Sequence, residues 1–249
     1  CTTDQIEDEI LNLLTFSIKL LKSFGFDSIE ADLSTRPEKS IGNNDDWEKA
    51  TNSLKSALEN QNISYVTAHG EGAFYGPKID LHVKDAIGRR WQLSTIQVDF
   101  AQPDNFDLQF VDSNNKRVKP VMIHRALLGS IERFTGILIE NYAGEFPGWL
   151  SPVQVKILTI GDVSNYVNKI TKSLKGFRYE VDDRNLRLGE KLHDASKDKV
   201  PISMIVGEKD ELSNTLAINI RSQDNQQNVK YEDAIKQIKA NLKTPIFKI

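Results

Sequence analysis

The sequence predicts two successive domains that combine β-sheet with α-helix, the second of them an α/β domain. Three observations support this prediction. Two segments near the start repeat apolar residues at helical spacing, and strands that alternate apolar and polar residues follow them. Glycine and proline then crowd into residues 144–152, which interrupts regular structure. After that cluster, short apolar strands and helices alternate, which is typical of α/β folds with partly parallel strands.

Length and composition limit the possible classes of protein. The chain has 249 residues, which suits one or two domains, and its 39% apolar and 27% charged residues are typical of globular proteins. No window approaches about 18 consecutive apolar residues, so we expect no membrane partner. The one cysteine, Cys1, excludes an intrachain disulfide and indicates a reducing, cytoplasmic location. Because Cys1-Thr2-Thr3-Asp4 is no translation start, we expect a piece of a longer protein.

The charge is unevenly distributed along the chain. Residues 1–151 hold 15 Lys and Arg against 22 Asp and Glu, whereas the rest holds 17 against 13. A mildly basic second domain is compatible with contact to a polyanion such as RNA. An asymmetry of this size also arises often by chance.

The first domain, residues 1–150, opens with a helix signal. Thr2 followed by Gln5 fits a capping box, the apolar repeat from Ile6 to Leu21 predicts the helix, and Gly25 ends it. We expect strands over 26–34, 63–67, 78–84, 90–98 and 118–123, a hairpin turn at 85–88, and helices from Asp45 and from about Arg125 to Tyr142.

The second domain, residues 152–249, begins after the glycine and proline cluster. Its predicted strands are 153–160, 177–181, 202–206 and 216–220, and its predicted helices are 164–174, 188–196 and 231–242. Residues 223–228 are interpreted as a polar loop.

The segment Gly70–Lys78 holds three glycines, a proline and two aromatic residues before a strand. Such a loop lets the backbone approach a ligand closely, and Tyr75 and Lys78 would suit an anionic small molecule. Taken alone, the stretch fits a tight surface turn with packed aromatic rings better than it fits a ligand loop. The segment lacks the Gly-Lys-Ser/Thr triplet of a phosphate-binding P-loop.

The strand that follows shows an unusual mixture of side chains. Strict alternation places one set on one face, namely Trp91, Leu93, Thr95, Gln97 and Asp99, and leaves Gln92, Ser94, Ile96 and Val98 on the other. A face with Thr, Gln and Asp together fits the lining of a polar pocket. It also fits a solvated face of an antiparallel sheet.

Two further candidates follow the strand predicted over 118–123. His124 would close that strand and could bind a metal ion through a neutral imidazole, although spacing alone favours a structural histidine. Gly129-Ser130 and Arg133 lie on the predicted helix that follows. A guanidinium there suits phosphate binding, or a surface ion pair with a carboxylate such as Glu132.

Taken together, these segments resemble the threonyl-tRNA synthetase family of class II aminoacyl-tRNA synthetases. The matching stretches occur in family order and at family spacing: Leu33–Lys39 with Ile41-Gly42, Gly70–Lys78, Thr95–Phe100, Val121–Ala126, Gly129–Arg133 and Phe146–Val155. The resemblance implies part of an α+β class II catalytic domain, an antiparallel sheet with flanking helices, followed by an α/β anticodon-binding domain with a mixed sheet.

The resemblance also implies roles for single residues. His124 would be the last of three zinc ligands, the other two lying before Cys1. Arg133 would be catalytic with Lys78 and Tyr75 at the pocket rim, while the residues that would bind ATP and the aminoacyl group are Gln92, Thr95, Gln97, Ser130 and Arg133. The residues that would contact the tRNA anticodon are Asn185, Asp210, Asn219 and Arg221, although the family often has an Arg where Asn219 stands.

The implied function is a threonine–tRNA ligase that uses ATP with Mg²⁺, holds Zn²⁺, acts on threonine and tRNA(Thr), and forms a homodimer through its catalytic domain. The isolated chain should be inactive, since the first two class II motifs would precede Cys1. A non-catalytic tRNA-binding or regulatory paralogue, or a synthetase for another amino acid, are alternatives. The polar residue set favours the enzyme, because a paralogue released from catalysis has no need of it.

Overall fold

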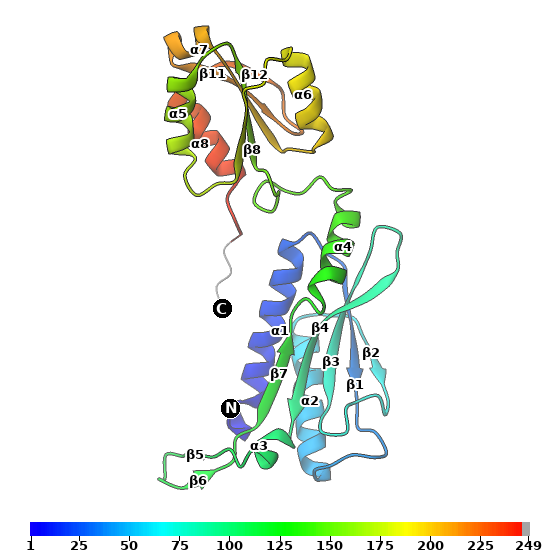
Figure 1. Ribbon diagram of the computed structural model, residues 1–249. Coiled ribbons are helices and arrows are strands. Elements are labelled where there is room, and N and C mark those ends of the chain that lie inside the picture. The colour runs from blue at the N-terminus through cyan, green and yellow to red at the C-terminus, as the bar shows by residue number, and fades with distance from the viewer. Residues whose placement is uncertain (246–249) are drawn as a thin grey trace. The chain divides into compact units, whose positions relative to one another are not determined.

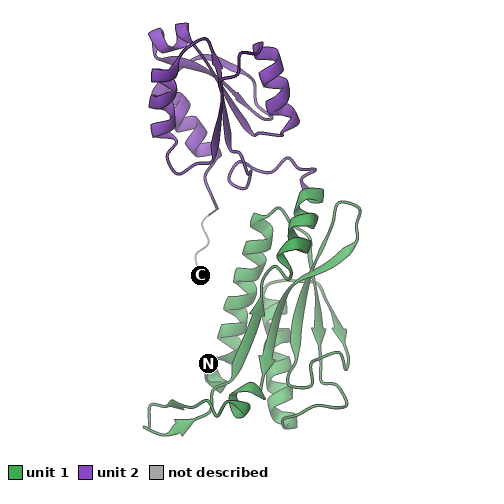
Figure 2. Cartoon of the chain, viewed as in Figure 1, with its two compact units in different colours: residues 1–141, 247–249 green, residues 142–246 purple. Residues whose placement is uncertain are grey.

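The computed structural model describes residues 1–245, and they divide into two compact units. The first unit holds residues 1–141 and the second begins at Tyr142 (Figures 1 and 2). Each unit has its own sheet, hydrophobic core and helices. Within residues 1–245, no helix combines the length and apolar character needed to cross a bilayer.

The first unit is a five-stranded sheet in the order β2-β1-β3-β4-β7. Its elements are the 3-10 helix η1 (Thr3–Gln5), α1 (Ile6–Ser23), β1 (Ile29–Ser34), α2 (Asn44–Asn60), β2 (Tyr65–Ala68), β3 (Lys78–Lys84), β4 (Arg90–Asp99), α3 (Gln102–Asn105), β5 (Phe110–Val111), β6 (Arg117–Val118), β7 (Met122–Ala126) and α4 (Ile131–Asn141). All neighbouring pairs are antiparallel except β1 with β2. The predicted sheet with flanking helices is confirmed.

Helices α1 and α2 form because each repeats apolar residues at helical spacing and has a capping signal. Gln5 Oε1 accepts the amide of Thr2 at 2.8 Å at the start of α1, and Gly25, with φ +85°, follows its end. Asn43 caps α2 by accepting the amide of Asp46 at 2.8 Å. Their apolar faces are buried with Ile79, Leu81, Ile96 and Val98 of the sheet, so the opposite sheet face carries the polar residues.

The second unit is a five-stranded sheet in the order β12-β11-β10-β8-β9. Its elements are β8 (Val155–Ile160), α5 (Ser164–Ser173), β9 (Tyr179–Asp182), α6 (Leu188–Lys197), β10 (Ile202–Gly207), α7 (Glu208–Ser213), β11 (Thr215–Ile220), β12 (Gln226–Lys230) and α8 (Tyr231–Asn241). β8 is parallel to β9 and β10, and the other pairs are antiparallel. The predicted mixed sheet is confirmed.

The core of the second unit lies between the sheet and helices α5 and α8. Ile157 and Met204 of the sheet contact Tyr166, Ile170 and Ile238 of those helices within one buried cluster. Helix α6 contacts β8 from the other side of the sheet, as Figure 1 shows. Both faces of the parallel strands are therefore covered, which parallel pairing requires.

The predicted strand over 118–123 is wrong. Residues 117–118 pair with β5 in a separate small hairpin, and the strand that joins the main sheet is β7, Met122–Ala126. Pro120 separates the two, and its ring removes a backbone donor that a continuous ladder would need. His124 and Arg125 consequently lie inside β7 and face opposite sides of the sheet.

The helix predicted from Arg125 begins six residues later, at Ile131. Gly129 has φ +61°, which interrupts the backbone between β7 and α4. Ser130 then caps the helix, because its Oγ accepts the amide of Arg133 at 3.2 Å. Elsewhere, residues 226–228 of the predicted polar loop belong to strand β12, which runs on to Lys230, and helix α7 was not predicted.

Candidate functional site

A bulge in β4 decides which of its side chains share the polar sheet face. Leu81 pairs with Ser94 but His82 pairs with Gln92, so Leu93 is an extra residue in the ladder. Strict alternation predicted that Gln92 and Thr95 lie on different faces of the sheet, and this prediction is wrong. The structure turns Leu93 into the core and brings Gln92, Thr95 and Gln97 to one face.

Asp80 lies at the centre of this face, and it is 5% exposed. Its Oδ1 accepts hydrogen bonds from Gln92 Nε2 at 2.6 Å and Thr95 Oγ1 at 2.7 Å, and its Oδ2 accepts Lys78 Nζ at 2.6 Å. Three of the sequence-predicted residues are therefore bonded to one carboxylate. The sequence analysis missed Asp80, although the alternation of Lys78, Asp80 and His82 with apolar residues was a signal for it.

The loop before β3 crosses the end of β4 at very close range. A Cβ on Gly76 would lie 1.8 Å from the carbonyl oxygen of Val98, so only glycine fits there. The amides of Val98 and Phe100 donate to the carbonyls of Pro77 and Tyr75 at 3.1 Å each. This contact holds Tyr75 so that its hydroxyl lies 3.2 Å from Gln97 Oε1.

His124 lies beside Gln97 in the register of β7 and β4. Its Nε2 is 2.7 Å from Oδ2 of Asp99, which is 1% exposed, while the His124 side chain is 44% exposed. Asp99 Oδ1 also accepts the amides of Ala101 and Gln102 at 2.8 and 3.0 Å. The ring is thus held at one nitrogen by a fixed carboxylate and presents Nδ1 on its other side.

Arg133 reaches back from the first turn of α4 toward β4. Its Nη2 donates to the backbone carbonyl of Gln92 at 3.0 Å. The neighbouring Glu132 accepts Ser130 Oγ at 3.0 Å, and its own backbone amide, followed by this hydroxyl, lowers the pKa of its carboxyl. The exposed guanidinium of Arg133 therefore lies at the edge of the polar face with no carboxylate bonded to it among residues 1–245.

A second charged group continues the face toward β1. Arg90 binds both oxygens of Asp32, at 3.0 and 2.6 Å, and Lys84 binds Glu30 at 2.5 Å. The hydrogen bond from Arg90 lowers the pKa of Asp32, and that from Lys84 lowers the pKa of Glu30. Burial lowers the pKa of His82, whose Nδ1 is buried without a hydrogen-bond partner in the described part of the chain.

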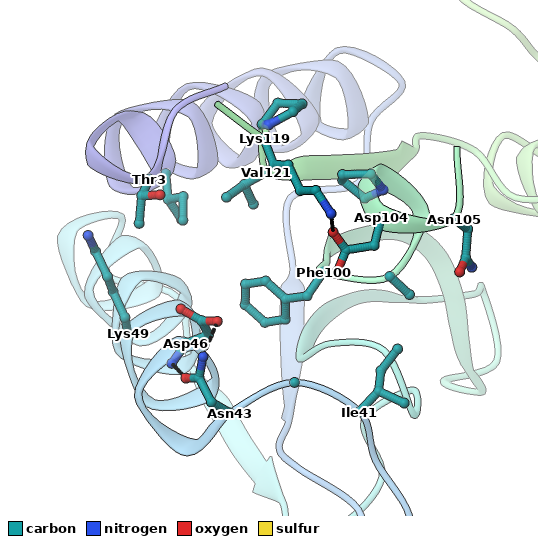
Figure 3. Close-up of a pocket in the computed structure, with 15 residues that line it drawn as sticks. Thr3, Ile41, Asn43, Asp46, Lys49, Phe100, Asp104, Asn105, Lys119 and Val121 are labelled. Atoms are coloured by element: carbon teal, nitrogen blue, oxygen red, sulfur yellow. Dashed lines mark hydrogen bonds and ion pairs between the residues drawn. The ribbon is translucent and has the colours of Figure 1, made fainter. Parts of the chain in front are cut away.

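A cavity of about 410 Å³ in this unit lies apart from these residues (Figure 3). It is lined by the starts of α1 and α2 and by the segment around α3, with Lys119 paired to Asp104 at its side. None of the sequence-predicted site residues lines it. We therefore place the candidate site on the polar sheet face.

No group of three or more His, Cys, Asp and Glu residues that could hold a metal ion occurs among residues 1–245. His124 is the residue here whose surroundings fit one ligand of such a site. A histidine that binds a metal usually bonds its other ring nitrogen to a carboxylate, and Asp99 supplies that carboxylate.

In the second unit, the four predicted anticodon residues do not share one cavity. Asn185 lines a cavity of about 640 Å³ beyond the ends of β8 and β9, whereas Asn219 and Arg221 line another of about 290 Å³. Asp210 accepts the amide of Gly207 at 2.9 Å and so caps α7. Arg221 donates to the carbonyls of Lys199, Glu145 and Phe146, a structural set of contacts.

Lys191 shapes the cavity around Asn185, and sequence reasoning missed it. Its side chain is among the fully buried ones, and its Nζ donates to the carbonyls of Thr159 and Asp182 at 2.7 and 3.0 Å. Arg184 pairs with Asp182 and Asp194, and its hydrogen bond lowers the pKa of Asp182. These bonds hold both ends of the loop that carries Asn185.

Comparison with known proteins relates both units to described families. Residues 1–142 match the family described as the tRNA synthetase class II core domain (G, H, P, S and T), and residues 154–241 match the anticodon-binding domain. The threonine–tRNA ligase of Clostridium tetani is 51% identical over 225 residues, which cover 89% of this chain and 35% of that protein. The threonine–tRNA ligase of Sulfurihydrogenibium sp. is 46% identical over 242 residues, which cover 96% and 38%.

A solved structure agrees with these relatives. The structure described as the RNA-binding domain of threonyl-tRNA synthetase from Cryptosporidium parvum Iowa II has a TM-score of 0.90 and 31% identity. The match covers 98% of this chain and 62% of that chain. The chain thus spans well under half the length of the two curated relatives, 35% and 38%.

Proposed function

Since this chain belongs to the class II aminoacyl-tRNA synthetase core family and also carries an anticodon-binding domain, we propose that it serves a threonine–tRNA ligase. The ligase activates threonine with ATP to threonyl-adenylate and transfers the threonyl group to tRNA(Thr). The observation that carries the proposal is the convergence of the predicted residues on one sheet face. There Asp80 bonds Lys78, Gln92 and Thr95, the hydroxyl of Tyr75 bonds Gln97, and Arg133 bonds the backbone of the same strand β4.

In the activation step, a carboxylate oxygen of threonine attacks the α-phosphorus of ATP. The bond to the β-phosphate oxygen breaks, and pyrophosphate leaves with the electron pair. Negative charge builds up on the departing group, and we assign the Arg133 guanidinium to stabilise it together with the Mg²⁺ that accompanies ATP. A preorganised cation with no bonded carboxylate suits this role, because its charge is available to the substrate.

In the transfer step, a hydroxyl oxygen of the terminal tRNA ribose attacks the carbonyl carbon of threonyl-adenylate and gives up its proton to a phosphate oxygen of the adenylate. The bond from that carbon to the phosphate oxygen breaks, and AMP leaves with the electron pair. We assign Gln92, Thr95, Gln97 and Ser130 to binding the nucleotide and aminoacyl groups. Tyr75 and Lys78 lie at the rim of the same face, where the ammonium of Lys78 is held by Asp80 at 2.6 Å. Fixed donors and acceptors at known positions orient the two reacting groups, which supplies much of the rate.

We assign His124 as one zinc ligand, with the remaining ligands outside the described residues. When bound, zinc supplies a Lewis acid for the amino and hydroxyl groups of threonine. Valine lacks the hydroxyl and would leave a polar site unpaired, which rejects it far better than an apolar pocket could. The buried Asp99 carboxylate supports the assignment because it orients the imidazole at 2.7 Å.

We propose that residues 152–249 form a domain that binds the tRNA anticodon. Asn185 in its open cavity is the strongest of the four candidates, and Asn219 lies at a second cavity with Arg221. We propose Asp210 as a contact through the end of α7. The mildly basic balance of this unit supports RNA binding. We further propose a homodimer through the catalytic domain and a cytoplasmic location.

The decisive experiment measures threonine-dependent exchange of pyrophosphate into ATP and charging of tRNA(Thr) by the full-length protein. We expect both activities, and we expect valine, which lacks the hydroxyl, to support far less exchange. A non-catalytic paralogue would bind tRNA(Thr) without either activity. A folded full-length protein that binds this tRNA but shows no threonine-dependent exchange would therefore contradict the proposal.

A further inference from the structure

Asp80 accepts three hydrogen bonds on a sheet face where each partner is a candidate substrate-binding residue. Its carboxylate pairs with the Lys78 ammonium at 2.6 Å and is 5% exposed, so solvent competes little for its oxygens. The register places Asp80 directly opposite Thr95 across β3 and β4. The contact with Gln92 depends on the bulge at Leu93, which turns Gln92 to the same face.

The chemistry of a carboxylate determines how the Gln92 amide must lie. An ionised carboxylate only accepts hydrogen bonds, so Gln92 must direct its Nε2 toward Asp80 Oδ1, at 2.6 Å. The same Nε2 lies 3.0 Å from Thr95 Oγ1, and the Thr95 hydroxyl donates its proton to Asp80 Oδ1. One amide proton of Gln92 is therefore committed to Asp80, and Thr95 Oγ1 lies beside the same nitrogen.

The acceptor end of Gln92 is consequently the end presented to a ligand. Gln92 is exposed, and its Oε1 has no hydrogen-bond partner among residues 1–245. Gln97 differs, because its partner is the Tyr75 hydroxyl at 3.2 Å. A hydroxyl both donates and accepts, so it leaves the Gln97 amide able to turn either way.

We propose that Asp80 is a positioning residue that sets the hydrogen-bond polarity of this site by fixing Gln92 as an acceptor. The inference rests on the proposed ligase function. The complementary substrate group is an N–H or O–H donor, which on threonyl-adenylate or its precursors is an ammonium, an exocyclic amine or a hydroxyl. Asp80 touches no substrate itself and acts through Gln92, Thr95 and Lys78.

The principal test is Asp80→Asn in the full-length protein, measured by threonine-dependent pyrophosphate exchange. An asparagine offers both a donor and an acceptor, so Gln92 can turn its oxygen inward and its NH₂ outward. We expect kcat/KM to fall on the order of 100-fold, the loss that follows from misplacing a binding group. The loss should appear in the KM of the substrate whose donor meets Gln92, so titrating threonine and ATP separately identifies that substrate.

A second variant distinguishes positioning from mere structural support. Asp80→Asn combined with Gln92→Glu keeps the net charge and reverses the donor and acceptor across the contact. In this double variant the carboxylate at position 92 accepts a hydrogen bond from the amide at position 80. Its other oxygen still faces the substrate. We expect the double variant to recover at least about 10-fold over Asp80→Asn alone, whereas Gln92→Glu alone should be impaired because two carboxylates then face each other.

Asp85→Asn is the matched control, since Asp85 is a buried carboxylate in the turn between β3 and β4 that bonds Arg89 and Trp91 instead. It should lower thermal stability without changing the KM pattern. Asp80→Asn within twofold of wild type, or a double variant no better than Asp80→Asn, would overturn the inference.

A measurement independent of ligase activity uses nuclear magnetic resonance on the 249-residue chain. The side-chain NH₂ protons of Gln92, identified by their loss in Gln92→Glu, should exchange slowly in wild type and quickly in Asp80→Asn. Fast exchange in both proteins would contradict the inference even if the full-length protein is an active ligase. If the Gln92 NH₂ protons exchange slowly with solvent but the full-length protein shows no threonine-dependent pyrophosphate exchange, the proposed function alone would be contradicted.

Discussion

The imidazole of His124 is bonded through Nε2 to the Asp99 carboxylate at 2.7 Å, so a nearly inaccessible acid holds a half-exposed histidine. Asp99 is in turn fixed by two backbone amides, from Ala101 and Gln102. An acceptor so firmly held determines both the orientation of the ring and which nitrogen carries the proton. Nδ1 is then the nitrogen that remains for a metal ion or a ligand.

His124→Ala in the full-length protein should lower zinc content and weaken threonine activation far more than ATP binding. Discrimination against valine should fall. In the wild type, valine leaves the zinc position that binds the threonine hydroxyl unpaired, and without zinc this penalty disappears. Zinc per chain and exchange rates with both amino acids are the measurements, with His69→Ala as control. If His124 is only structural, its replacement should instead lower the free energy of unfolding by about 1–3 kcal/mol through the lost hydrogen bond. Unchanged zinc and selectivity would show that role.

Arg133→Ala should raise the barrier of the activation step by about 2–4 kcal/mol, the usual cost of losing a preorganised charge-stabilising group. Folding should change little, because the side chain is exposed and makes one bond to the backbone of Gln92. Arg125→Ala is the matched control: Arg125 lies 5.1 Å over the Phe16 ring, on the helix-covered side of the sheet. Lower stability with full activity in Arg133→Ala would assign Arg133 a structural role.

Gly76→Ala should destabilise the chain by about 1–3 kcal/mol or more, the range for an overpacked site. The added Cβ would lie 1.8 Å from the Val98 carbonyl, so either the loop or β4 must move, and Tyr75 would lose its position beside Gln97. Gly136→Ala in α4 is the control, since nothing lies within 4 Å of its Cβ, and alanine there should stabilise by about 0.5–1 kcal/mol. Chemical denaturation measures both, and equal stabilities would refute the close approach.

The stability of the chain should fall at acidic pH because of Asp85. Burial alone would raise its pKa, but hydrogen bonds from Trp91, Arg89 and Ile87 outweigh burial and lower the pKa to about 2. Between its ordinary pKa of about 4 and about 2, the unfolded chain therefore binds more protons than the folded one. The stabilisation is complete above about pH 4 and is lost as pH falls through this range. Melting temperatures from about pH 7 to about pH 2 should show a steeper acid decline for wild type than for Asp85→Asn, with the exposed turn variant Asp112→Asn as control.

Asn185→Ala and Arg221→Ala should separate RNA contact from structural support in the second unit. Asn185→Ala should weaken binding of an RNA hairpin that carries the tRNA(Thr) anticodon loop while leaving the melting temperature unchanged. Arg221→Ala should lower the melting temperature, because three backbone carbonyls lose their donor. Fluorescence anisotropy and thermal melting of the 249-residue chain give both numbers. Equal RNA affinity for wild type and Asn185→Ala would remove Asn185 from the proposed anticodon site.

Much of the architecture could be predicted because its signals are local. The apolar repeats of α1 and of α2, the latter starting at Trp47, predict their helices directly, and the alternation along β3 predicts its limits without error. The limits of β7 and α4 could not be predicted in this way. Residues 121–130 are apolar enough for either state, and Pro120 and Gly129, rather than periodicity, decide where strand and helix begin.

The sequence by itself determined the family, the two units that each combine a sheet with helices, and the residue types that converge on the polar face. Motif order and burial periodicity are properties of the chain, so they can be recognised without the structure. Only the tertiary structure decided that Gln92 joins Thr95, that Asp80 and Asp99 hold the candidate residues, and that Arg221 is committed to carbonyl contacts. The physical reason is that a bulge, a strand register and a hydrogen-bond partner depend on pairs of residues distant in sequence. Their free energy appears only when the strands have paired, so no local pattern contains it.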